Sequence, residues 1–182
     1  MERIKVLIVD DHTLVRDGLK ALLAKVKCIQ VISVAANGLE AIEKVKESHP
    51  DVVLMDISMP GMSGLDAMVE INKISDKPKV ILLSMELCED SISVGFKNGM
   101  KGFLPKDLKK ERLVEAIKRV HLGEVYFDPR VSDILLEGAQ KATFKRRVSE
   151  HFKHRKGKMA LELIAILALE VLAGMLLGFI GI

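Results

Sequence analysis

Several features that would assign a function quickly are scarce or missing in these 182 residues. Only two cysteines are present, Cys28 and Cys88, and their spacing matches no common metal-ligand pattern, so we interpret both as reduced, partly buried thiols. The chain contains no G-x-x-x-x-G-K-[ST] loop, which excludes a nucleotide site of that type. No apolar signal core precedes the first predicted strand at Ile4, and we therefore expect this part of the chain in the cytosol.

Charged residues are distributed unevenly along the chain. Residues 1–140 contain 20 Lys and Arg against 22 Asp and Glu, whereas residues 141–182 contain 8 against 3. All eight of the later bases lie between Lys141 and Lys158. A near-neutral region is thus followed by a strongly basic strip, and such asymmetry indicates an anionic partner for the strip, either nucleic acid or a lipid surface.

Short apolar runs alternate with segments that repeat apolar residues at helical spacing. The apolar runs cover residues 4–9, 29–35, 52–55, 80–83 and 102–104, and the helical segments cover 13–26, a stretch after 38, 65–74, 90–98 and 111–122. Five strands that alternate with five helices predict an α/β fold, a doubly wound five-stranded parallel sheet with helices on both faces.

Polar side chains follow these strands, and in this class of sheet ligands bind beyond the carboxyl ends of the strands. The ends carry three carboxylates, a hydroxyl and an amine: Asp10, Asp11, Asp56, Ser84 and Lys106. Clustered carboxylates repel one another unless a cation neutralises them, and oxygen ligands with open positions suit Mg²⁺. A carboxylate can also attack phosphorus, while Mg²⁺, a lysine and a hydroxyl stabilise the transferring phosphoryl group. The sequence therefore predicts a phosphoryl-accepting site.

Four motifs at these strand ends resemble the response-regulator receiver family. They are V-L-I-V-D-D-H at 6–12, D-V-V-L-M-D-I-S-M-P-G-M-S-G at 51–64, V-I-L-L-S-M at 80–85 and K-G-F-L-P-K-D at 101–107. The resemblance covers about residues 3–137 and implies a flavodoxin-like receiver domain over 1–137. The Lys-Asp pair at 106–107 and the Tyr-Phe-Asp-Pro run at 126–129 are similar to the NarL/LuxR type.

The resemblance also implies which residues accept the phosphoryl group and bind the metal. Asp56 matches the phosphoacceptor of the family. Asp10 and Asp11 match the acidic pair that binds Mg²⁺ together with the acceptor, and Ser58 lies where a backbone carbonyl completes the metal site. His12 follows the acidic pair directly, and we interpret it as a solvated histidine at the start of a helix.

Three further positions match the residues that respond to phosphorylation in the family. Ser84 matches the switch hydroxyl, and Lys106 matches the lysine that contacts the phosphoryl group. Phe103 lies at the aromatic switch position. Because phenylalanine lacks a phenolic hydroxyl, any switching at this position depends on ring packing alone.

The chain departs from the NarL/LuxR type after Glu137. Regulators of that type continue into a four-helix DNA-binding domain, whereas only 45 residues follow here, and no threonine-arginine-glutamate opening is present. The composition of residues 138–158 predicts a basic linker, and that of residues 159–182 predicts an apolar C-terminal helix. Such a helix would be roughly 36 Å long, which is enough to cross a bilayer core of about 30 Å. Because bases precede this helix, as in the positive-inside rule, we expect a transmembrane anchor. A soluble oligomerising helix and an altered reading frame are the alternatives.

These patterns predict a response regulator, not an enzyme, that accepts a phosphoryl group from a sensor histidine kinase on Asp56. Phosphorylation would then switch a partner interaction at the inner face of the cell membrane. The alternatives are a DNA-binding transcriptional regulator with a reduced output region and a phosphate sink without output. The basic strip lacks interleaved aromatic residues and a groove-reading element, so a nucleic-acid partner is not favoured. A homodimer is a further option.

Overall fold

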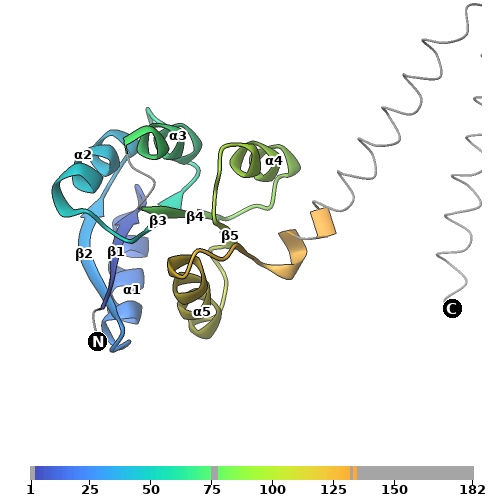
Figure 1. Ribbon diagram of the computed structural model, residues 1–182. Coiled ribbons are helices and arrows are strands. Elements are labelled where there is room, and N and C mark those ends of the chain that lie inside the picture. The colour runs from blue at the N-terminus through green and yellow to red at the C-terminus, as the bar shows by residue number, and fades with distance from the viewer. Residues whose placement is uncertain (1–2, 75–77, 132, 135–182) are drawn as a thin grey trace, which may run out of the picture. The chain divides into compact units, whose positions relative to one another are not determined.

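Strands and helices alternate along the chain in the computed structural model, which describes residues 3–74, 78–131, 133 and 134 (Figure 1). The strands are β1 (Ile4–Val9), β2 (Ile29–Ala35), β3 (Val52–Asp56), β4 (Lys79–Ser84), β5 (Gly102–Pro105) and β6 (Tyr126–Phe127). The helices are α1 (Thr13–Ala24), α2 (Gly38–Ser48), α3 (Gly64–Ile74), α4 (Glu89–Lys97) and α5 (Lys110–His121). The predicted α/β class is therefore confirmed.

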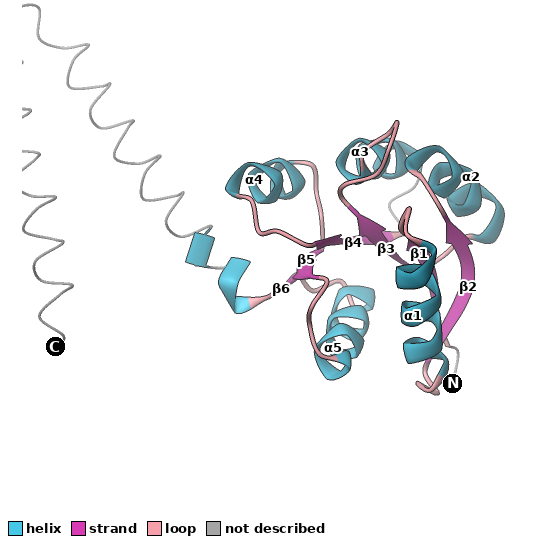
Figure 2. Ribbon diagram, turned by 180° about the vertical axis from the view of Figure 1, so that it is seen from behind, coloured by secondary structure: helices cyan, strands magenta, loops and turns pink. Residues whose placement is uncertain are grey.

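The strands form one parallel sheet in the order β2-β1-β3-β4-β5-β6. Helices α1 and α5 cover one face of the sheet, and α2, α3 and α4 cover the other (Figures 1 and 2). The chain moves outward from β1 to β2 and then returns past β1 to β3. The connections after β1 and β3 thus leave toward opposite faces, which opens a crevice at the carboxyl ends of these two strands.

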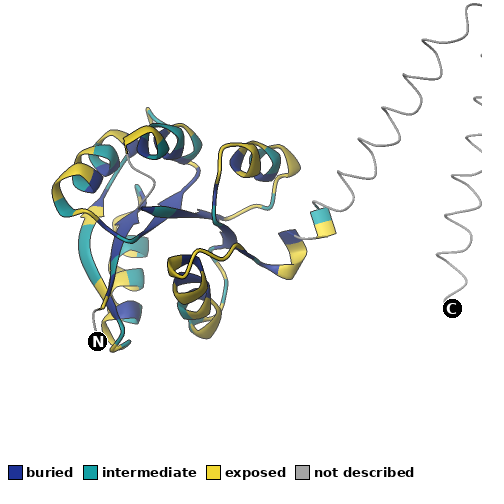
Figure 3. Ribbon diagram, in the orientation of Figure 1, coloured by how far each residue is buried: buried dark blue, intermediate teal, exposed yellow. Residues whose placement is uncertain are grey.

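Each face of the sheet buries its own apolar cluster. In β3, Val53 and Met55 pack with buried residues of α2, α3 and α4, while Val52 and Leu54 pack with buried residues of α1 and α5. Because side chains of a strand alternate between its faces, a strand covered on both sides must be apolar at nearly every position. The continuous burial of the central strands in Figure 3 explains why their sequences are uninterrupted apolar runs.

The prediction of five strands was wrong by one, because a sixth strand follows α5. The two residues of β6 pair in parallel with β5, and the Tyr126 amide donates to the Lys101 carbonyl at 2.9 Å. A strand of two residues is too short to produce an alternating pattern. It follows Gly123, which ends the helical region with a φ of 91° that favours glycine. The sheet extends past β5 as a result.

Other predictions concern residues near the C-terminus. The basic linker over 138–158 and the apolar helix over 159–182 lie outside the described residues. Within the part of the chain that the structure describes, no helix combines the length and the apolar character needed to cross a bilayer.

Candidate functional site

Three charged side chains from separate strand ends meet at the carboxyl edge of the sheet. Asp10 follows β1, Asp56 ends β3 and Lys106 follows β5, and the pairing of Val9 with Met55 brings the first two side by side. The Lys106 Nζ atom lies 2.7 Å from Asp10 Oδ2 and 2.8 Å from Asp56 Oδ2. Their side chains are 9%, 0% and 4% exposed for Lys106, Asp10 and Asp56. Three of the predicted site residues therefore form one buried, ion-paired cluster.

Burial and pairing act in opposite directions on the pKa values of this cluster. Burial raises the pKa of Asp56, and the hydrogen bond and charge of Lys106 oppose this effect without cancelling it, so the pKa stays above its ordinary value. For Lys106, burial alone would lower the pKa, but the contacts with Asp10 and Asp56 outweigh burial and raise it. Lys106 therefore remains a cation, whereas burial destabilises the ionised form of Asp56 in the folded chain.

The carboxylates around Asp56 form a set of atoms suited to a cation. One ligand atom from each of Asp10, Asp11, His12 and Asp56 lies within 4.8 Å of the others. Asp10 Oδ2 and Asp11 Oδ1 are buried, and each has one charged or polar neighbour: Lys106 Nζ lies 2.7 Å from Asp10 Oδ2, and His12 Nδ1 lies 2.8 Å from Asp11 Oδ1. Three carboxylates against one ammonium leave two negative charges in excess. The oxygen-rich donor set and the excess negative charge therefore fit a hard divalent cation such as Mg²⁺.

Backbone contacts hold the loops that carry these residues. The amide of His12 donates to Asp10 Oδ1 at 2.9 Å, and Arg16 Nη1 donates to the Asp10 carbonyl at 2.6 Å. The amide of Ser58 donates to Asp56 Oδ1 at 3.4 Å. The role predicted for the Ser58 carbonyl at the metal site stays a prediction. These contacts fix the two carboxylates from the β1–α1 and β3–α3 loops.

A glycine lets α3 begin directly against the end of β3. The Gly64 amide donates to the Ile57 carbonyl at 2.9 Å. A Cβ atom added at Gly64 would lie 1.9 Å from the carbonyl oxygen of Asp56, far inside any permitted contact. Glycine is therefore required here for close backbone approach, and the position of Asp56 depends on it.

The two predicted switch residues lie near the cluster in different environments. Ser84 ends β4, and its hydroxyl donates to the Glu86 carbonyl at 2.5 Å and accepts from the Glu86 amide at 3.2 Å. The hydroxyl is thus engaged by its own loop. Phe103 is fully buried in the cluster that also contains Ile92 of α4. Its ring therefore belongs to the same apolar cluster as the helix that follows the Ser84 loop.

His12 approaches the carboxylates more closely than the sequence interpretation implied. Its side chain is 68% exposed at the start of α1, yet Nδ1 lies 2.8 Å from Asp11 Oδ1 and 3.4 Å from Asp10 Oδ1. The only signal in the sequence is the direct succession of the two aspartates and the histidine. Position along the chain does not determine the direction of a side chain in a turn, so the contact could not be predicted.

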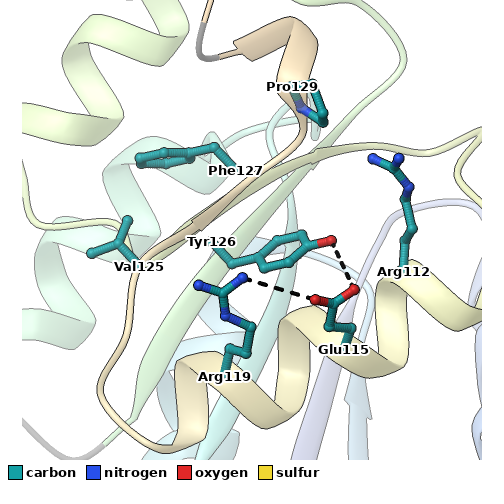
Figure 4. A pocket seen from close by; sticks show the side chains of 7 residues that line it. All are labelled: Arg112, Glu115, Arg119, Val125, Tyr126, Phe127 and Pro129. Carbon is teal, nitrogen blue, oxygen red and sulfur yellow. Dashed lines mark hydrogen bonds and ion pairs between the residues drawn. The ribbon is translucent and has the colours of Figure 1, made fainter.

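A cleft of about 480 Å³ lies between α5 and β6, away from the cluster (Figure 4). It is lined by Arg112, Glu115, Arg119, Val125, Tyr126, Phe127 and Pro129. The Tyr126 hydroxyl donates to Glu115 at 3.4 Å, and Arg119 lies 3.8 Å from Glu115 and 5.3 Å above the Tyr126 ring. The negative charge of Glu115 is thus compensated by Arg119, and both side chains contact Tyr126. We interpret this group as structural, because it holds β6 against α5.

Comparison with known sequences gives a consistent family. The profile of the response regulator receiver domain matches residues 6–118. The oxygen regulatory protein NreC of Staphylococcus carnosus is 37% identical over 133 residues, which are 72% of this chain and 61% of that protein. The nitrate/nitrite response regulator protein NarL of Escherichia coli is 31% identical over 147 residues, 80% of this chain and 68% of that protein. The chain thus spans about two thirds or less of these relatives.

Comparison with solved structures gives the same fold. A two-component response regulator of the LuxR family from Aurantimonas sp. SI85-9A1 superposes with a TM-score of 0.72 at 26% identity, covering 76% of this chain and 99% of that chain. The signal receiver domain of a NarL response regulator from Mycobacterium tuberculosis superposes with a TM-score of 0.66 at 30% identity, covering 68% of this chain and all of that domain.

Proposed function

This chain belongs to the response regulator receiver family, and we propose that it accepts a phosphoryl group on Asp56 from a sensor histidine kinase. The observation that carries the proposal is the buried cluster in which Lys106 Nζ pairs with both Asp10 and Asp56 at 2.7 and 2.8 Å. A nucleophilic carboxylate, a fixed ammonium and neighbouring carboxylates that can bind a metal ion are the groups that phosphoryl transfer to an aspartate requires.

The chemistry follows from the positions of these side chains. An oxygen of Asp56 attacks the phosphorus of the kinase phosphohistidine, the phosphorus–nitrogen bond breaks, and the imidazole leaves with the bonding electrons and takes up a proton. An acyl phosphate on Asp56 is the product. Lys106, 2.8 Å from Asp56 Oδ2, is placed to pair with an oxygen of the transferred group, and Asp10 keeps it charged and oriented.

The carboxylates are the natural ligands for a divalent cation in this reaction. Asp10, Asp11 and Asp56, with the Ser58 carbonyl, would hold Mg²⁺. When bound, Mg²⁺ would neutralise the excess negative charge of the site and of the phosphoryl oxygens. The close grouping of carboxylate oxygens and their excess negative charge support this assignment.

We propose that phosphorylation is read through the loop that follows β4. For the Ser84 hydroxyl to donate to a phosphoryl oxygen, it must release the Glu86 carbonyl that it contacts at 2.5 Å. The loop leads into α4, which packs over Phe103, so a change at Ser84 would alter the surface of α4. A partner that recognises this surface would receive the signal, and the chain would act as a switch rather than as an enzyme with turnover.

We further propose that the receiver lies in the cytoplasm and that residues 159–182 anchor the chain to the inner face of the membrane. The support is compositional: 24 residues contain two charges and follow eight bases between Lys141 and Lys158. A DNA-binding regulator and a phosphate sink remain the competing functions. A chain that is found outside the membrane fraction and binds DNA would favour the DNA-binding regulator. A chain that is phosphorylated but binds no partner would favour the phosphate sink.

Beryllium fluoride, which binds to an acceptor aspartate as a phosphoryl mimic, tests the site without a kinase. Fluorine NMR of the wild type should show protein-bound signals when Mg²⁺ is present and none after chelation. The Asp56→Asn variant should show none in either condition. Asp66→Asn, which changes an exposed carboxylate of α3, should behave as the wild type does. Bound signals in the Asp56→Asn variant would contradict the assignment.

A further inference from the structure

We propose that His12 supplies a nitrogen ligand to the metal site, so that the site prefers transition-metal ions such as Co²⁺ over Mg²⁺ more strongly than carboxylates alone would. The inference rests on the metal site of the proposed function and adds a residue to it. Its basis is geometric: one ring nitrogen of His12 and one oxygen from each of three aspartates lie within 4.8 Å of one another.

The distances are compatible with a single coordination shell. In an octahedral site with ligands about 2.1 Å from the ion, neighbouring ligand atoms are about 3 Å apart and opposite ones about 4.2 Å apart. Nδ1 lies 2.8 Å from Asp11 Oδ1 and 3.4 Å from Asp10 Oδ1, which are the separations of neighbouring ligands. No two of the four ligand atoms are more than 4.8 Å apart, so a small contraction brings all of them within one coordination shell.

Two independent observations point to a cation at this place and to a ring that is free to reach it. Asp10 is fully buried, and Lys106 is the cation paired with both Asp10 and Asp56, so the three aspartates carry two negative charges in excess. The His12 backbone is fixed at the site because its amide donates to Asp10 Oδ1 at 2.9 Å. The imidazole makes no capping hydrogen bond to α1 and is 68% exposed, so it can turn without loss of packing.

The nature of the ligand decides which ions benefit. Mg²⁺ prefers oxygen ligands and gains little when an imidazole replaces a bound water. Imidazole binds the later first-row ions well, and affinity for a nitrogen-containing site increases from Mn²⁺ to Co²⁺ and Ni²⁺. Loss of the ring should therefore weaken Co²⁺ binding much more than Mg²⁺ binding.

Titration calorimetry of the full chain with Mg²⁺ and Co²⁺ tests this inference. His12→Ala should weaken Co²⁺ binding by about tenfold or more and Mg²⁺ binding by less than about threefold. His121→Ala removes an exposed histidine of α5 and should change neither affinity. The visible absorption of bound Co²⁺ should lose its nitrogen contribution only in His12→Ala. Equal weakening for both ions, or unchanged Co²⁺ binding, would overturn the proposal.

Asp11→Ala separates this inference from the proposed metal site. It should abolish Mg²⁺ binding at the site, and any Co²⁺ it still binds measures binding at other histidines. If Asp11→Ala leaves Mg²⁺ binding intact, the metal site itself is wrong. If Asp11→Ala abolishes Mg²⁺ binding while His12→Ala keeps full Co²⁺ affinity, the site stands and only the role of His12 fails.

Discussion

At the scale of single residues, burial and ion pairing act in opposite directions on Asp56, the carboxylate that we propose as the phosphoryl acceptor. It is 3% exposed, and burial holds its pKa above the ordinary value despite the contact with Lys106. Two like charges about 4 Å apart repel by about 4 kcal/mol at an effective dielectric constant of 20. A divalent cation that relieves this repulsion is therefore favoured at the site.

The raised pKa of Asp56 predicts a specific dependence of stability on pH. The folded chain binds the Asp56 proton more tightly than the unfolded chain, whose pKa is near 3.8. The contribution of Asp56 to stability is therefore greatest below that value and is lost as the pH rises through the folded pKa. In the absence of divalent cations, Asp56→Asn should be more stable than the wild type at pH 7, by about 1.4 kcal/mol for each unit of elevation.

Urea denaturation of both proteins in a chelator, at intervals between pH 3 and pH 7, measures this difference. The difference in the free energy of unfolding between the two proteins should be small near pH 3, should increase as the pH rises, and should become constant above the pKa of Asp56 in the folded chain. A wild type that is the more stable of the two at pH 7 would show that the pairing with Lys106 outweighs burial.

A contact in the site could be predicted from the sequence where the backbone topology determines it, and could not where the direction of a side chain or the path of a loop determines it. Asp10, Asp56 and Lys106 were predicted together because parallel strands end at the same edge of the sheet. The present partner of the Ser84 hydroxyl, the Glu86 carbonyl, was not predicted, because it depends on the path of a loop. The contact of His12 with Asp11 was missed for the same reason.

At the scale of elements, the junction between β3 and α3 controls the position of the acceptor. Gly64→Ala would place a methyl group 1.9 Å from the Asp56 carbonyl oxygen, a backbone atom that cannot turn aside. We expect the substitution to lower the free energy of unfolding by about 3 kcal/mol, at the upper end of the range for added methyl groups. Binding of beryllium fluoride should weaken as well, because Asp56 must move.

Gly18→Ala is the matched control, because Gly18 lies in α1 with no atom within 4 Å of the added Cβ. It should stabilise the chain by about 0.5–1 kcal/mol through helix propensity and leave the site unchanged. Urea denaturation of the two variants gives the comparison. If Gly64→Ala were as stable as the wild type and bound the mimic normally, the close approach of α3 to β3 would be unimportant.

The strands also show where the pattern of apolar residues in the sequence no longer predicts secondary structure. The central strands β1, β3 and β4 were predicted from mostly apolar runs, since burial on both faces leaves few positions for polar residues. Two residues cannot carry such a pattern, and β6 is held by pairing with β5 and by the packing of Tyr126. Its existence depends on contacts that are distant in the sequence, which local patterns do not contain.

At the scale of the whole molecule, the anchor proposed for residues 159–182 makes a prediction about location. A Lys or Arg at the centre of a spanning helix costs about 2.5–3.5 kcal/mol. Leu167→Arg with Val171→Arg should therefore cost about 5–7 kcal/mol and release the chain from membranes in cell fractionation. Alanine at both positions costs far less and should leave the chain in the membrane fraction.

The receiver domain supplies the control for that experiment. Phosphorylation of Asp56 should be equal in both double variants, because the site is built from residues 10–106. A wild type recovered in the soluble fraction would favour an oligomerising helix. A wild type removed from membranes by a high-salt wash would favour surface attachment through the bases between Lys141 and Lys158.

The central claim is that Asp56 accepts a phosphoryl group, and mapping the modified residue tests it most directly. The full chain is incubated with acetyl phosphate and Mg²⁺, its mass is measured, and the acyl phosphate is reduced with borohydride to mark the modified aspartate for peptide sequencing. We predict a gain of one phosphoryl group, located at Asp56, that is absent after chelation and in Asp56→Asn. Modification of equal extent in Asp56→Asn, or a mark at another residue of the wild type, would contradict the account.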